Sequence, residues 1–173
     1  MLHLPSGICS TAGSEAIDLA ASCGLVLDDW QCYHVRALMA QQRDGDALRW
    51  AAMENASIEP RQNGKGAIIT TIELSFLYLQ RLPLTLHTAH ETRTAKEGFQ
   101  RLLDAIDQNA ELRKLVAKRI RSRGDEGLEM VDGRRLMVVA RTNGGGRGLS
   151  APALVWDEAY ALTDEQIAAQ MPV

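Results

Sequence analysis

The order of the predicted elements is that of an α/β fold, with a mostly parallel sheet flanked by helices. From Trp50 onward, short apolar strands alternate with helical segments, a pattern that favours parallel strands joined by crossover helices. The long segment that begins at Thr92 repeats apolar residues at helical spacing, with Phe99, Leu102 and Leu103 on one face. Such an amphipathic helix is typical of one that covers a sheet.

The first fifty residues predict helices rather than strands. Residues 1–13 are expected to form a loose tail, and serine or aspartate caps predict helices at 15–23 and 30–42. The sequence Arg-Asp-Gly-Asp at 43–46 predicts a turn.

The remaining residues predict the core of the fold. The expected elements are a strand at 50–58, a loop at 60–64, a helix at 66–79, a strand at 84–87, a helix at 92–109, a helical turn at 111–115, a strand at 116–120, a hairpin over 128–140, a glycine-rich loop at 142–150, a strand at 153–156 and a last helix from Thr163. The Asp132-Gly133 pair is a strong hairpin signal. Ligands of such sheets bind at the carboxyl ends of strands, which points to residues 59–66 and 157–158.

Bulk composition excludes several classes of protein. A length of 173 residues suits one domain, and 19 basic against 22 acidic side chains do not favour a module that binds DNA by itself. Three cysteines without a Cys-x-x-Cys pair argue against a disulfide framework or zinc site. No apolar run approaches membrane-spanning length and the start has no signal-peptide pattern, so we expect a cytoplasmic protein without a membrane partner.

The first motif that carries chemistry is Glu59-Pro-Arg-Gln-Asn-Gly-Lys-Gly66. It lies between a predicted strand and a predicted helix, where backbone N–H groups and a helix N-terminus favour an anion. Lys65 would reach the β- and γ-phosphates of a nucleotide. The general pattern is GxxxxGK[ST], but Glu59 replaces its first glycine and Gly66 its hydroxyl residue. An ordinary Asn-Gly turn beside a lysine is therefore the alternative interpretation.

The second motif is Ala153-Leu-Val-Trp-Asp-Glu158, an apolar strand that ends in two carboxylates. Asp157 would hold Mg²⁺, largely through water. Glu158 would orient and deprotonate the attacking water. The alternative interpretation is a strand that ends in a solvated acidic pair.

Together these motifs resemble those of phage terminase large subunits. Arg61-Gln62-Asn63-Gly64-Lys65-Gly66 is similar to the Walker A motif of the long-tailed phage group with RQNGK, and Asp157-Glu158-Ala159 is similar to the Walker B acids. Asp29-Trp30-Gln31 resembles the upstream adenine-contacting motif, and Leu86–Ala95 and Gly146–Gly148 also match. The resemblance covers roughly residues 24–173. It implies a P-loop NTPase that hydrolyses ATP to translocate double-stranded DNA into a viral capsid.

The resemblance also implies a role for each matching residue. The metal-positioning residue would be Asp157, and the catalytic residues would be Glu158, Arg61 and Arg147, the last as an arginine finger supplied to a neighbouring subunit. The nucleotide-binding residues would be Trp30, Gln31, Arg61, Gln62, Asn63, Gly64, Lys65 and Gly66.

The same resemblance implies the organisation and the partners of the chain. Residues 1–173 would form one terminase-like ATPase domain: an N-terminal tail and helix at 1–23, an adenine-side helical segment at 24–50 and a P-loop core at 51–173. The coupling motif and nuclease domain of the family would be absent, which would leave the sheet incomplete at the C-terminus and the isolated chain a slow ATPase. The implied cofactors are ATP and Mg²⁺. The implied partners, in a bacterial host, are double-stranded DNA, a terminase small subunit, a capsid portal and further copies of the chain in a ring.

Two other functions stay open from the sequence. A helicase-like P-loop ATPase would share both motifs but act on unwound strands, and the stretch Arg61-Gln62-Asn63 disfavours it. A non-catalytic prophage remnant would bind nucleotide without turnover.

Overall fold

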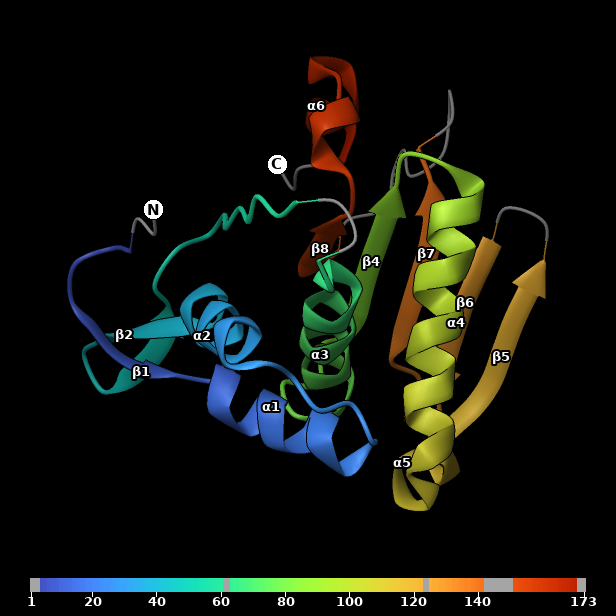
Figure 1. Ribbon diagram of the computed structural model, residues 1–173, viewed down its shortest axis with the longest axis horizontal. Coiled ribbons are helices and arrows are strands. Elements are labelled where there is room, and N and C mark those ends of the chain that lie inside the picture. Colours follow the sequence, from blue (N-terminus) through green and yellow to red (C-terminus); the bar gives the residue numbers. More distant parts are fainter. Residues whose placement is uncertain (1–3, 61–62, 123–124, 142–150, 171–173) are drawn as a thin grey trace. The chain divides into compact units, whose positions relative to one another are not determined.

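The computed structural model describes residues 4–60, 63–122, 125–141 and 151–170 (Figure 1). The chain forms two compact units, residues 1–75 and residues 76–173, and the helix α3 (Lys65–Tyr78) crosses the boundary between them. The predicted division into one ATPase domain with three segments stays a prediction. In the described part of the chain, no helix combines the length and the apolar character that a membrane span needs.

The first unit combines two helices with a small antiparallel sheet. Its elements are β1 (Ile8–Thr11), α1 (Gly13–Ser22), α2 (Asp29–Leu38), β2 (Ala40–Asp44) and β3 (Ala47–Trp50), and the strand order is β1-β2-β3. The expected helix at 30–42 was too long, because the chain leaves α2 at Met39 and pairs β2 with β1. The turn predicted at 43–46 is the tip of the β2–β3 hairpin.

The strand predicted at 50–58 was wrong, because β3 ends at Trp50 and residues 51–60 lie in neither a helix nor a strand. The large apolar side chains of this stretch do not support a buried strand. Met53 is 100% exposed and Ile58 is 97% exposed. Without apolar burial, an extended segment has little to offset the entropy of ordering its backbone.

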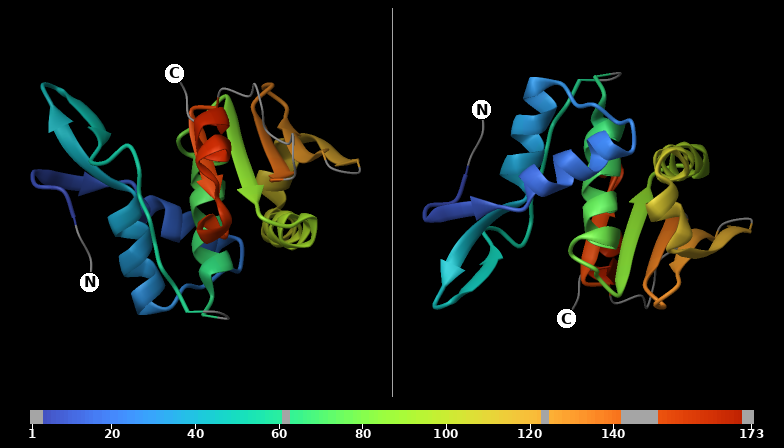
Figure 2. Two further views of the ribbon diagram at one scale, coloured as in Figure 1. Left: turned by 90° about the horizontal axis from the view of Figure 1, so that it is seen from above. Right: turned by 90° about the horizontal axis from the view of Figure 1, so that it is seen from below.

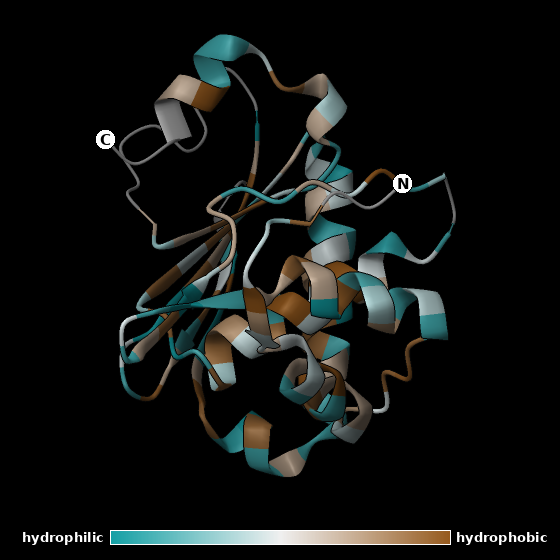
Figure 3. Ribbon diagram, turned by 90° about the vertical axis from the view of Figure 1, so that its left-hand side faces the viewer, coloured by the Kyte–Doolittle hydropathy of each residue, from teal (hydrophilic) through white to brown (hydrophobic). Residues whose placement is uncertain are grey.

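Helices α1 and α2 approach each other closely at Gly13. A Cβ atom placed on Gly13 would lie 2.6 Å from the Cα atom of Arg36 and 2.7 Å from the carbonyl oxygen of Val35. The hydroxyl of Thr11 donates to the Arg36 carbonyl at 2.7 Å, beside the same contact. Figure 3 shows hydrophobic and hydrophilic residues alternating along the helices, and the buried positions of α1 are the small residues Gly13, Ala16 and Ala20. Small side chains therefore permit the close packing.

We expect Gly13→Ala to destabilise the protein. Alanine normally favours a helix over glycine by up to about 1 kcal/mol, but here its methyl group would meet backbone atoms that cannot move aside. Overpacking of this kind costs about 1–3 kcal/mol. Urea unfolding would measure the change, with Asp18→Ala on the exposed side of α1 as the control. An unchanged midpoint for Gly13→Ala would contradict the close approach.

The second unit is built on a five-stranded sheet of order β5-β6-β7-β4-β8. Its strands are β4 (Leu84–Ala89), β5 (Val116–Ser122), β6 (Asp125–Met130), β7 (Arg135–Ala140) and β8 (Ala153–Trp156). Its remaining helices are α4 (Thr92–Gln108), α5 (Ala110–Lys114), the 3₁₀ turn η1 (Ala159–Ala161) and α6 (Asp164–Gln170). The α/β class is therefore as predicted.

The sheet is mixed, so the expectation of a mostly parallel sheet was wrong. Strand β4 pairs in parallel with β7 and β8, but β6 pairs antiparallel with both β5 and β7. The hairpin predicted at Asp132-Gly133 is the physical reason, because a tight turn makes β6 and β7 antiparallel. Within the second unit, the described strands form one continuous sheet with β8 at its edge. The expected incompleteness of the sheet at the C-terminus stays a prediction.

Strand β4 lies in the core of the second unit. All six of its residues are buried, and its parallel neighbours cover both of its edges. Helix α4 packs across β4, β7 and β6 on one face of the sheet, as Figure 1 and Figure 2 show from three directions. Its buried residues include Phe99, Leu102, Leu103 and Ile106. This is the apolar face predicted from the helical spacing.

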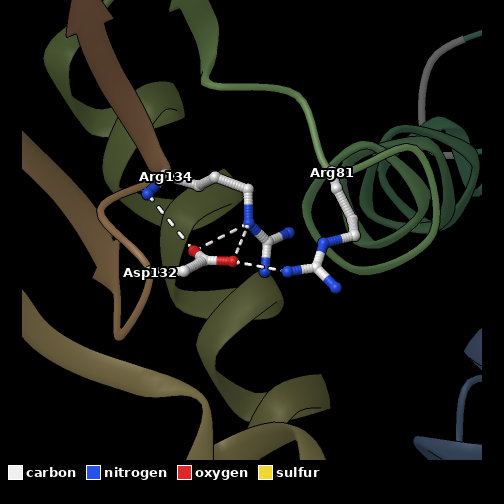
Figure 4. Close-up of polar contacts among 3 residues, drawn as sticks. All are labelled: Arg81, Asp132 and Arg134. Atoms are coloured by element: carbon white, nitrogen blue, oxygen red, sulfur yellow. Dashed lines mark hydrogen bonds and ion pairs between the residues drawn. The ribbon is translucent and has the colours of Figure 1, made fainter.

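A charged cluster ties the β6–β7 turn to the loop before β4 (Figure 4). The Arg134 Nε atom lies 2.8 Å and 2.7 Å from the two carboxylate oxygens of Asp132, and an Arg81 Nη2 atom lies 2.9 Å from one of them. These contacts, with that of Arg134 the largest, lower the pKa of Asp132 to about 2. The cluster therefore stabilises the folded state only while Asp132 is ionised.

We expect the stabilising effect of Asp132 to disappear in acid. Because its folded pKa is depressed, the contribution is complete above about pH 4 and is lost as the pH falls toward 2. The unfolding free energies of the wild type and Asp132→Asn should differ near neutral pH and converge in acid. Arg134→Met should remove most of the same pH dependence. A difference that persists unchanged at low pH would contradict this assignment.

Candidate functional site

The carboxyl ends of three parallel strands meet at one edge of the second unit. Beyond the last residue of β7, the Arg141 N–H donates to the Ala89 carbonyl at 2.8 Å. Beyond the last residue of β8, the Asp157 N–H donates to the Thr88 carbonyl at 2.8 Å. The ladder therefore continues one residue past each strand, and it places Arg141 and Asp157 on either side of the end of β4.

The acidic pair predicted from the sequence lies at this edge. Asp157 is buried, with 2% of its surface exposed, and Glu158 is half-buried. Glu158 has φ 55° and ψ 50°, a left-handed conformation that non-glycine residues rarely adopt. Such a backbone costs on the order of 1–3 kcal/mol and persists only where neighbouring contacts hold it.

Arg141 supplies those contacts. One guanidinium nitrogen, Nη2, donates to the carbonyl oxygens of Asp157 at 2.6 Å and Glu158 at 2.9 Å. The other, Nη1, donates to the Thr88 carbonyl at 2.9 Å and to its hydroxyl at 3.1 Å. Arg141 is 4% exposed. A single buried side chain therefore joins the carboxyl ends of β7, β4 and β8.

The electrostatics of Arg141 reflect its burial. Loss of solvent is the largest influence and lowers the pKa of Arg141, while the nearby charges of Asp157 and Glu158 oppose that effect. Arginine nevertheless stays protonated in proteins. The Arg141 carbonyl also accepts from the Gln166 side chain at 3.3 Å, which connects this edge to the first turn of α6.

The first unit brings the predicted adenine-contacting residue to the predicted phosphate loop. The Gln31 Nε2 atom donates to the carbonyl oxygen of Gly64 at 3.2 Å, and its Oε1 atom accepts from the Asp28 N–H at 2.8 Å. Gly64 has φ +77°, and an added Cβ would lie 2.4 Å from Gln31 Nε2. Position 64 therefore requires glycine for its backbone and for the approach of Gln31.

The start of the predicted loop also contacts α2. The Glu59 carboxylate lies 3.5 Å from His34 Nε2 and accepts from the Ser57 hydroxyl at 2.5 Å. The other ring nitrogen of His34 is hydrogen-bonded to the Trp30 carbonyl. The rings of Trp30 and His34 also pack edge to face, with their centroids 5.4 Å apart. Glu59, which stands where the general pattern has glycine, thus has a structural partner.

The remaining predicted residues divide between the two units. Helix α3 begins at Lys65, so Lys65 and Gly66 occupy its first turn, as the sequence predicted. Asn63 and Gly64 are exposed just before it. A shared nucleotide site would require Lys65 to lie near Asp157, and this proximity stays a prediction, since these residues belong to different units. Arg61, Gln62 and Arg147 lie outside the described residues.

The acidic edge suits a magnesium ion whose ligands are mainly water and the phosphate oxygens of a bound nucleotide. Among the described residues there is no group of three or more histidine, cysteine or acidic side chains that would cage a metal. Mg²⁺ in nucleotide sites needs only one or two carboxylates, with water and phosphate oxygens as its other ligands. A single buried carboxylate such as Asp157 fits that requirement.

Sequence reasoning did not identify Arg141 or the His34–Glu59 contact. The signal for Arg141 was a charged residue directly after the apolar strand Leu136–Ala140. An arginine in that position would be buried at a strand end, where backbone carbonyls are available as acceptors.

Comparison with known proteins supports the fold. The chain is similar to the crystal structure of the HK97 bacteriophage large terminase, with a TM-score of 0.72 and 20% sequence identity. The match covers 92% of this chain but 35% of that terminase, so the chain spans about a third of its length. No family model and no curated protein matches the sequence. The chain therefore has the fold of part of a phage large terminase.

We expect Gln31→Leu to destabilise the first unit, because it removes the bonds to Asp28 and Gly64. Each hydrogen bond contributes about 0.5–1.5 kcal/mol, so the loss should be roughly 1–3 kcal/mol. Chemical denaturation would measure it, with Gln108→Leu at the exposed end of α4 as the matched control. Equal stabilities of the two variants would show that the bonds of Gln31 contribute nothing.

Proposed function

We propose that this chain is an ATP-hydrolysing P-loop domain of a viral DNA-packaging terminase large subunit. The observation that carries the proposal is the acidic pair Asp157-Glu158 at the carboxyl end of β8, held beside the end of β4 by Arg141. Ligands of α/β sheets bind at this edge. The similarity in fold to the HK97 bacteriophage large terminase supports the assignment to DNA packaging.

The proposed reaction is phosphoryl transfer from ATP to water. Lys65, at the start of α3, binds the β- and γ-phosphates, and the helix N-terminus favours their negative charge. Glu158 orients the attacking water and accepts its proton while the water oxygen bonds to the γ-phosphorus and the bond to the β-phosphate oxygen breaks. Asp157 would hold Mg²⁺, which would supply positive charge to the phosphates. The products are ADP and inorganic phosphate.

The remaining predicted roles belong to the same proposal. Trp30 and Gln31 contact the adenine, Arg61 adds charge near the γ-phosphate, and Arg147 acts as an arginine finger in a neighbouring subunit. An arginine finger contributes about 10³–10⁵ in turnover. Because the finger comes from a second copy, the rate of ATP hydrolysis should increase with the concentration of the chain. The proposed role in DNA packaging further implies that double-stranded DNA increases the rate. The terminase small subunit and the capsid portal are the proposed partners of the full packaging machinery.

Two substitutions separate binding from chemistry. Lys65→Ala should weaken binding of a fluorescent ATP analogue, because it removes the cation that contacts the phosphates. Glu158→Gln should keep that binding and lower turnover by about 10²–10⁴, the usual contribution of a general base. Turnover would be followed with radiolabelled ATP at high protein concentration, with and without double-stranded DNA.

Matched controls are available on exposed parts of the chain. Lys118→Ala on β5 and Glu54→Gln in the segment after β3 remove the same groups from exposed positions, and both should behave as the wild type. Loss of binding in Lys118→Ala as well would show a general charge effect. A wild type that neither binds nor hydrolyses ATP would refute the proposed function.

A second candidate is a module that binds nucleotide without turnover. It is favoured by two observations: residues 51–60 form no strand before the loop, and Gly66 provides no hydroxyl for Mg²⁺. Binding of the ATP analogue by the wild type, weakened by Lys65→Ala and with no hydrolysis under any condition, would support this candidate over the ATPase.

A further inference from the structure

The carbonyl groups that Arg141 binds lie on both sides of Glu158. The Asp157 carbonyl belongs to the peptide that precedes the Glu158 Cα atom, and the Glu158 carbonyl belongs to the peptide that follows it. Arg141 Nη2 bonds both oxygens, at 2.6 Å and 2.9 Å. Because peptide groups are planar, fixing both of them fixes φ and ψ of Glu158. The direction of its Cα–Cβ bond follows.

We propose that Arg141 is a positioning residue that holds Glu158 in its left-handed conformation and thereby aims its carboxylate. This inference rests on the proposed ATPase function and extends it to a residue that does not itself contact the nucleotide. Without Arg141, Glu158 relaxes toward an ordinary backbone conformation, which removes the strain of the left-handed one. Its side chain then leaves the edge of the sheet in another direction.

Asp157 depends less on Arg141 than Glu158 does. Its N–H is held by the Thr88 carbonyl at 2.8 Å as part of the strand ladder. That bond does not involve the guanidinium, so loss of Arg141 changes the backbone after Asp157 more than the backbone before it. Arg141 therefore acts mainly on the residue proposed to activate water.

The anchor points of Arg141 make it a rigid support. Its Nη1 atom bonds both oxygens of Thr88, which lies in the buried strand β4. The guanidinium is planar, so Nη1 and Nη2 cannot move independently. Because Arg141 is held by the buried strand β4 at one end of its guanidinium, it holds the two peptides around Glu158 at a fixed position relative to that strand. A lysine has one charged nitrogen and would satisfy only part of this set.

The principal test replaces Arg141 with methionine in the full 173-residue chain. The kcat for ATP should fall on the order of a hundredfold, the effect of a displacement of about 1 Å in a catalytic group, while KM for ATP stays unchanged. Arg141→Lys should recover part of the rate. Arg135→Met, at the exposed opposite end of the same strand, is the matched control and should hydrolyse ATP as the wild type does. A parallel rise in KM would overturn the proposal.

A double substitution tests whether Arg141 acts through Glu158. If it does, adding Arg141→Met to Glu158→Gln should lower kcat no further, because effects of residues that act as a unit are not additive. A full additional loss would show that Arg141 contributes by another route and would overturn the proposal.

Hydrogen exchange tests the same inference without hydrolysis. The Ala161 N–H donates to the Glu158 carbonyl at 3.2 Å, so relaxation of Glu158 should speed exchange at Ala161 in Arg141→Met. The Asp157 amide should stay protected by Thr88. If Arg141→Met does not fold, Arg141→Lys serves for the same comparison. Unchanged exchange at Ala161 would refute the inference even if the wild type hydrolyses ATP. Faster exchange in a chain without ATPase activity would support the positioning role and refute only the proposed function.

Discussion

The complete burial of β4 is the constraint on which the second unit depends. Parallel neighbours pair with both of its edges, from Leu84 opposite Arg135 to Thr88 opposite Trp156, and all six residues are shielded from water. Buried backbone groups must be hydrogen-bonded, so the ladder has to run the full length of the strand. Charged side chains are absent from the strand itself, and Arg141 and Asp157 lie directly after the last residues of its neighbours β7 and β8.

Charge at the end of a buried strand needs acceptors, and the backbone provides them. Burying a guanidinium without hydrogen bonds costs several kcal/mol, whereas Arg141 has four bonds to oxygen atoms of Thr88, Asp157 and Glu158. Those bonds also hold a backbone conformation at Glu158 that would otherwise be unfavourable. The cost of burying the arginine and the strain at Glu158 are thus offset by the same contacts. The carboxyl edge is consequently fixed before any ligand binds.

The sequence predictions were accurate where an element is determined by residues within a few positions of one another, and inaccurate where it depends on distant parts of the chain. Strand β8, helix α4 and the hairpin at Asp132-Gly133 were predictable because apolar spacing and turn residues act within a few positions. The mixed sheet and the β1–β2 pairing were not, because strand partners come from distant parts of the chain. Arg141 was missed for the same reason, since its acceptors lie 16, 17 and 53 residues away and are mainly backbone atoms.

The predicted phosphate loop shows how a poor motif match can still have a defined geometry. Gly64 takes the left-handed conformation that the turn requires, and its carbonyl accepts from the Ala67 N–H at 2.9 Å as α3 begins. The same carbonyl accepts from Gln31, the residue whose side chain also caps α2. A contact across 33 residues therefore fixes the peptide that precedes Lys65. Because residues 51–60 form no strand before this loop, its geometry depends on two residues. One is Gly64, which the GxxxxGK[ST] pattern contains, and the other is Gln31 of α2, which the pattern does not specify.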